Sequence, residues 1–254
     1  MDKMDGDIMG EREILMVPII TIFMFLGITL GGIFSFLFRF ILGMKIERTF
    51  VFCGGLLLGL ILFELLPESF TQNSWMGIVL GILAGILSMS IAEKLLHKNL
   101  NVANGSLEYI RSFVLLLVAI GIHNLPTGLA LGTTMKTDAF SLSPLLAALI
   151  LHHIPEGMAL MGAMAFVESP SVLFVISAVF LAVVLGASIF IGFLIGDNSY
   201  KLNTLLFGGA IGTLSFVTFH EILWKAKRKM RFHEFGLYVL LGLLFVYMFL
   251  LLIH

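Results

Sequence analysis

The chain has 254 residues, of which 59% are hydrophobic and only 12% are charged. A soluble domain is about 45–50% apolar and about 25% charged, so this composition excludes a soluble enzyme, a disordered chain and a disulfide-stapled secreted module. With 15 Lys and Arg against 16 Asp and Glu, the formal net charge of −1 does not indicate nucleic-acid binding. The single cysteine, Cys53, cannot form an internal disulfide. The composition indicates a polytopic membrane protein.

Eight hydrophobic stretches follow one another along the chain. A helix needs about 20 mostly apolar residues to cross the bilayer core, and the length of these runs favours helices over barrel strands. We therefore predict an all-α polytopic membrane protein with eight transmembrane helices in a single domain, residues 14–254. The predicted spans are Ile14–Gly43, Phe50–Leu66, Trp75–Leu96, Tyr109–Thr134, Ser143–Phe166, Val172–Ile195, Leu202–Leu223 and Phe235–His254.

The residues before the first span are acidic. A cleaved signal peptide would instead begin with a basic segment, so we expect the first span to remain in the mature protein. Residues 1–13 are predicted to form an acidic extracytoplasmic tail. Its acidic residues are Asp2, Asp5, Asp7, Glu11 and Glu13.

Positively charged residues concentrate in alternate links between the spans. Eleven flank one set of links, against four on the other side. The positive-inside rule then places the protein in the cell membrane with both termini outside the cytoplasm. The eleven are Arg39, Lys45, Arg48, Lys94, Lys98, Arg111, Lys225, Lys227, Arg228, Lys229 and Arg231.

Glycines recur four residues apart in several spans, a spacing that lets two helices approach closely. Close packing within one monomer is the favoured interpretation, and a homodimer face is the alternative. The pairs are Gly27/Gly31, Gly55/Gly59, Gly77/Gly81/Gly85, Gly128/Gly132, Gly192/Gly196 and Gly208/Gly212.

Several polar side chains lie inside predicted spans, where an ionisable group costs about 2.5–3.5 kcal/mol on insertion scales. Such groups normally face the protein interior, where they are paired, bound to a ligand or hydrated. Spans four and five carry His123, Asn124, His152, His153 and Glu156, whereas Glu64 ends span two and His220 and Glu221 end span seven.

The spacing within span five supports a metal-ligand interpretation. His152 and Glu156 are four residues apart, so both project from one helix face. Imidazole nitrogen and carboxylate oxygen together suit zinc and other first-row divalent metals. Asn124 and His153 lie about 100° round the helix from their neighbours His123 and His152, and face an adjacent site or support the first one.

Spans four and five also resemble each other, since residues 123–128 and 152–157 both place a histidine three residues before a proline. A weaker similarity links spans two and seven. Three spans, a central pair and three spans therefore predict a 3+2+3 inverted repeat, an arrangement typical of transporters that bind substrate at broken helices near the membrane midplane.

At these motifs the sequence resembles the ZIP (Zrt/Irt-like) divalent metal transporters of the bacterial, GufA-like branch. Residues 123–128 match the family's His-Asn-x-Pro-Glu-Gly motif except at Thr127, and residues 152–157 match its fifth-span motif. The resemblance implies a primary metal site at His123, His152 and Glu156, with Asn124 and His153 near a second site. It also implies a transport route lined by Glu64, His220 and Glu221.

Two departures from the family pattern bear on a second metal. Thr127 replaces the carboxylate of span four, and span six has no acidic residue before Asp197. We therefore expect one well-formed metal site rather than a binuclear centre.

The predicted function is movement of a divalent cation, with Zn²⁺ as the first candidate, into the cytoplasm. Fe²⁺, Mn²⁺ and Co²⁺ remain open, because affinity for such ligands does not settle selectivity. The metal is cargo and no prosthetic group is expected, so the expected partners are the metal ion, the lipid bilayer and, as an open question, a second copy of the chain.

The alternative is a metal-dependent intramembrane hydrolase, which would need the same ligands and an activated water. His220 and Glu221 are not followed by the second histidine of a His-Glu-x-x-His motif, so the enzyme interpretation has little support.

Overall fold

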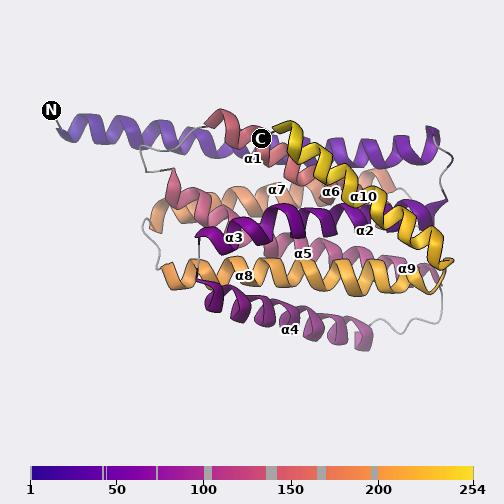
Figure 1. Cartoon of the computed structure of the whole chain (residues 1–254). Helices are drawn as coiled ribbons and strands as arrows, with labels where there is room; N and C mark the ends of the chain where they lie inside the picture. Colours follow the sequence, from indigo (N-terminus) through magenta and orange to yellow (C-terminus); the bar gives the residue numbers. More distant parts are fainter. Residues whose placement is uncertain are drawn as a thin grey trace.

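The structure is a computed structural model that describes residues 2–41, 43, 45–72, 74–99, 105–135, 142–164, 170–195 and 200–253. The described chain is a bundle of long helices without a strand, which confirms the all-α prediction (Figure 1). The elements are α1 (Asp2–Ile41), α2 (Ile46–Leu60), the π-helix η1 (Ile61–Leu65), α3 (Leu66–Gln72), α4 (Trp75–Asn99), α5 (Gly105–Thr134), α6 (Leu142–Ala163), α7 (Pro170–Ile195), α8 (Tyr200–Phe216), the π-helix η2 (Val217–Trp224), α9 (Lys225–Lys227) and α10 (Phe232–Ile253).

Each predicted span coincides with a helix. Seven helical segments of the described chain are long and apolar enough to cross a membrane. The remaining predicted span is α6, in which the side chains before His153 lie outside the described residues. The apolar span Glu47–Leu65 begins three residues before the predicted Phe50, and it lies in a helical run of α2, η1 and α3 that continues without a break from Ile46 to Gln72. The backbone of α1 begins at Asp2, so the acidic segment continues directly into the first span.

The irregular helical turns lie in spans two and seven. Helices α5 and α6 continue through Pro126 and Pro155, whereas η1 and η2 are π-helical. Pro67 follows η1 closely, and a proline ring clashes with the carbonyl four residues earlier in a regular α-helix, which favours a widened turn here. No proline accounts for η2. Such π-turns are frequent at functional sites, and these two contain Glu64, His220 and Glu221.

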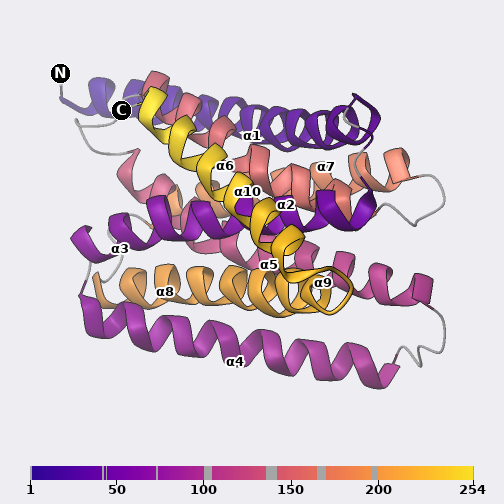
Figure 2. The same ribbon diagram turned by 45° about the vertical axis from the view of Figure 1, so that its right-hand side comes forward.

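The long helices pack in four close pairs, namely α1 with α6, α5 with α7, α4 with α8 and α2 with α10. Figures 1 and 2 show the pairs stacked side by side, with α4 and α8 at one edge and α1 at the other. In Figure 2 both ends of the chain lie on one side of the bundle, and α9 lies on the opposite side.

Glycines permit the close approach in these pairs, as the sequence predicted. A methyl group added at Gly157 of α6 would overlap the backbone carbonyl of Ile28 in α1, and one added at Gly85 of α4 would overlap the carbonyl of Gly209 in α8. Both obstacles are backbone atoms, which cannot move aside as a side-chain end can. The described glycines of the helix pairs α1–α6 and α4–α8 therefore pack against neighbouring helices of the same monomer.

Gly157→Ala should destabilise the protein by about 1–3 kcal/mol, because the overpacked crossing must move apart. The unfolding midpoint in detergent measures this effect. Gly236→Ala is the matched control, since a methyl group there has nothing within 4 Å, and alanine at an exposed helical position is favoured by about 1 kcal/mol over glycine. Equal midpoints for the two variants would contradict the predicted crossing.

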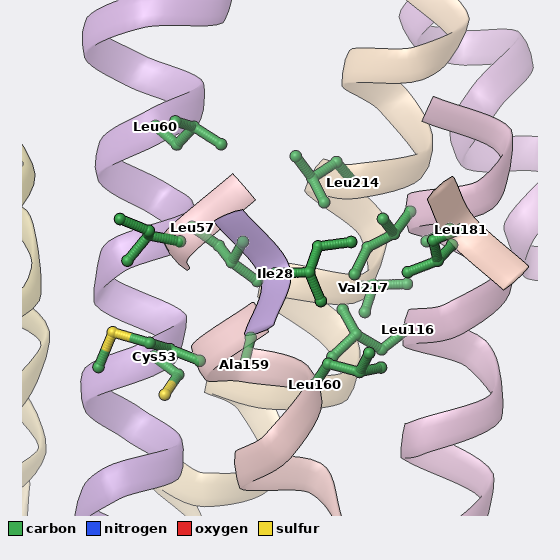
Figure 3. Close-up of a cluster of buried hydrophobic side chains, with 14 of the residues drawn as sticks. Ile28, Cys53, Leu57, Leu60, Leu116, Ala159, Leu160, Leu181, Leu214 and Val217 are labelled. Carbon is green, nitrogen blue, oxygen red and sulfur yellow. The ribbon is translucent and has the colours of Figure 1, made fainter. Parts of the chain in front are cut away.

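An apolar layer fills the centre of the bundle. Figure 3 shows Ile28, Leu57, Leu116, Leu160 and Val217 converging from different helices. Each of these side chains is fully buried. Along α5 this layer separates Ser112 from His123, residues about 16 Å apart at 1.5 Å per residue.

Candidate metal-transport site

The first polar cluster lies where α5 meets α6. His123 of α5 is 2% exposed, and His153 and Glu156 of α6 are each 1% exposed. The Nε2 of His123 lies 3.9 Å from Glu156 Oε1, and the Nε2 of His153 lies 3.7 Å from Glu156 Oε2. The structure therefore places one buried carboxylate between two imidazoles.

These separations suit a transition-metal ion after a small contraction. Zinc takes nitrogen and oxygen ligands at about 2.0–2.2 Å, so two ligands of a tetrahedral ion lie about 3.3–3.6 Å apart. Each oxygen of Glu156 faces a different histidine. Among the described residues, the three donor atoms are not gathered within 4.8 Å of one another, so an ion bound here would draw one histidine inward.

The other predicted residues of this region have different positions. Asn124 is 1% exposed, and neither polar atom of its side chain has a hydrogen-bond partner among the described residues. The hydroxyl of Thr127 donates to the carbonyl oxygen of His123 at 3.1 Å, so it is engaged by its own helix. The predicted ligand His152 has its backbone in α6, but its side chain lies outside the described residues.

A second polar cluster lies at the end of the bundle opposite the termini, where α4, α5 and η2 meet. The Nδ1 of His220 lies 3.3 Å from Glu221 Oε1 and 3.6 Å from Glu93 Oε2. One ligand atom from each of these three residues lies within 4.8 Å of the others, a spacing that a metal ion can bridge. Glu221 is fully buried, whereas the side chain of His220 is 45% exposed and its ring stacks on Phe216.

Two cations share this inner cluster, which we define as Glu93, Arg111, His220, Glu221 and Lys225. The Nη2 of Arg111 lies 3.8 Å from both Glu93 Oε1 and Glu221 Oε1. Lys225 contacts Glu221 Oε2 directly. Ser112 donates to that oxygen at 2.9 Å and accepts from Lys225 at 3.3 Å. The cluster is therefore a network of two carboxylates and two cations joined by ion pairs and by the hydroxyl of Ser112.

Sequence reasoning found His220 and Glu221 but missed their partners. Glu93, which precedes Lys94, was not among the predicted site residues. Arg111 and Lys225 were counted only as positive charges that flank the links between spans. Arg111 is 6% exposed in the folded protein, but this burial cannot be predicted from the neighbouring sequence. Glu64 is half-buried in η1, which packs against α8, and it is not grouped with the inner cluster.

A family model described as ZIP zinc transporter matches residues 104–253, more than half of the chain. The chain belongs to the ZIP family. No curated protein matches the chain. The match runs from the start of α5 to the end of α10, so it contains the first cluster and most of the inner cluster.

ZIP proteins are membrane transporters of metal ions and not enzymes, so the resemblance read from the histidine motifs is confirmed. The hydrolase alternative is not favoured. As a ZIP protein the chain takes a divalent metal as substrate, and its several apolar helices make it a multi-pass membrane protein.

Proposed function

We propose that this ZIP protein imports Zn²⁺ into the cytoplasm through a site built from His123, His152, His153 and Glu156. The observation that carries the proposal is the buried carboxylate of Glu156 between two imidazoles from two helices. Carboxylate oxygen and imidazole nitrogen together form a ligand set that suits a divalent transition-metal cation.

The site binds one ion in this proposal. The hydroxyl of Thr127 is engaged by its own helix, and the described part of α7 has no carboxylate to bind a second ion. Asn124 offers a buried amide that has no hydrogen-bond partner in the described chain, and we assign it to the edge of the site.

The route continues from the central site to the inner cluster, with Glu64, His220 and Glu221 along it. We place the protein in the cell membrane with both termini and the acidic segment 1–13 outside. The basic residues around α9 support this orientation, since α9 lies at the end of the bundle opposite the termini (Figure 2). Metal would then enter from the terminal side.

The helix pairing supports a 3+2+3 inverted repeat. If spans one to three correspond to spans six to eight, and span four to span five, the pair α1–α6 corresponds to α7–α5 and the pair α4–α8 corresponds to α10–α2. The two π-turns then fall in equivalent spans, two and seven. A central site between the equivalent spans four and five is what such a repeat favours.

Uptake of ⁶⁵Zn²⁺ into proteoliposomes tests the function. Wild type should show saturable uptake that His123→Ala lowers by about a hundredfold, because a ligand of the central site is lost. His233→Ala is the matched control, since His233 is an exposed residue near the start of α10. Competition by Mn²⁺, Fe²⁺ and Co²⁺ ranks the metals. A folded wild-type protein that moves none of these ions would overturn the proposal.

A further inference from the structure

The inner cluster is electrically balanced without a metal. Glu93 and Glu221 supply two negative charges, and Arg111 and Lys225 supply two positive charges within ion-pair distance of them. Adding a divalent cation to this set would leave an excess of two positive charges around a carboxylate that is fully buried. Because repulsion between buried charges is weakly screened, one of the resident cations must leave when the metal arrives.

The two cations differ in their freedom to leave. The side chain of Arg111 is 7% exposed and reaches both carboxylates from the interior of α5. The side chain of Lys225 is 17% exposed and belongs to the last helical turn before the basic link. Lysine carries its charge on a flexible stem that can turn toward water, whereas the planar fork of arginine holds two acceptors in place.

We propose that Lys225 is a tethered counter-cation that occupies Glu221 while the route carries no metal and is displaced by the arriving ion. Arg111 stays in place and keeps the two carboxylates together. Return of Lys225 to Glu221 then expels the metal from the cluster. This inference rests on the proposed transport function, because it assigns the inner cluster to the route of the metal.

The hydrogen bonds of Ser112 fit this exchange. Its hydroxyl already donates to Glu221 Oε2 at 2.9 Å, so the carboxylate keeps a donor when Lys225 leaves. The stacking of His220 on Phe216 holds the imidazole beside Glu221. When Lys225 leaves, this imidazole can bind the metal together with the carboxylate of Glu221. Lys225 therefore competes with the metal for one carboxylate without being needed to build the cluster.

Equilibrium binding of Co²⁺ tests the exchange in purified protein, in a Glu156→Gln background that weakens the central site. Adding Lys225→Met should tighten Co²⁺ binding about tenfold, the effect of removing a competing contact worth about 1.4 kcal/mol. The visible absorption of the bound ion reports its ligands. Adding Lys227→Met instead is the matched control, because Lys227 is an exposed lysine of the same basic segment.

Two further variants complete the test. Lys225→Arg should bind Co²⁺ no more tightly than the parent does, since it retains a cation that arginine holds at least as firmly, and Glu93→Gln should abolish the gain produced by Lys225→Met. Equal affinities for the Lys225→Met and Lys227→Met proteins would overturn the inference. This readout is independent of transport, so a wild-type protein without zinc flux would count against the proposed function and not against the exchange.

Discussion

Replacing Glu156 with glutamine should lower metal transport by about a hundredfold or more, since the substitution removes the carboxylate that lies between His123 and His153. Glutamine keeps the shape of the side chain, and its amide can accept and donate hydrogen bonds with the two imidazoles. The fold should therefore survive while the divalent ion loses its counter-charge. Initial rates of ⁶⁵Zn²⁺ uptake at several concentrations, normalised to folded protein, measure the loss.

Glu234→Gln provides a matched control for this experiment. Glu234 pairs with Arg48 at 3.5 Å, but both side chains are about one third exposed. An exposed pair of this kind contributes about 0–1 kcal/mol, so its loss should leave uptake close to wild type. Wild-type uptake by the Glu156→Gln protein would remove Glu156 from the route and with it the central site.

The largest effect on stability should follow from Glu221→Leu, at about 3 kcal/mol or more. The substitution leaves Lys225 and the buried Arg111 without the carboxylate that both contact, and removing one partner of a buried ion pair costs about 3–5 kcal/mol. The partial exposure of Lys225 places the expected value at the lower end of that range. Chemical unfolding in detergent, followed by tryptophan fluorescence, measures the change.

A double variant separates lost charge pairing from lost packing. Glu221→Leu combined with Lys225→Leu removes both members of the pair, and apolar replacement of a whole pair is often neutral. The double variant should therefore recover more than half of the stability that the single variant loses. If the two proteins unfold at the same denaturant concentration, the contact between Lys225 and Glu221 is not what stabilises this end of the bundle.

The helices and the family could be predicted from the sequence because their signals are local. Uninterrupted apolar runs predict spans whatever their neighbours are, and the His123 and His152 motifs lie within single helices. The start of span two was placed three residues too far inward, and its helix continues past the predicted end at Leu66 into α3. Hydropathy marks the apolar part of a helix and not the polar turns that continue it.

The inner cluster could not be predicted in the same way, because its members come from three separate helices. Glu93, Arg111 and Lys225 are each next to a link, where charged residues ordinarily face water and reveal the orientation of the chain. Lys225 lies four residues after Glu221, a spacing that the sequence shows, whereas only the packing of separate helices brings Glu93 and Arg111 to this place. The π-turn of η2, which no proline explains, likewise depends on its surroundings.

The apolar layer around Leu116 and Val217 has an electrical consequence. Polar clusters lie on both sides of it, so we expect a large part of the membrane voltage to fall across this layer of lower dielectric constant. A unit charge that crosses a membrane gains about 2.3 kcal/mol per 100 mV. A divalent ion that moves inward across the layer therefore gains up to about 4.6 kcal/mol per 100 mV. In a cell with a negative interior, the voltage therefore favours that inward step.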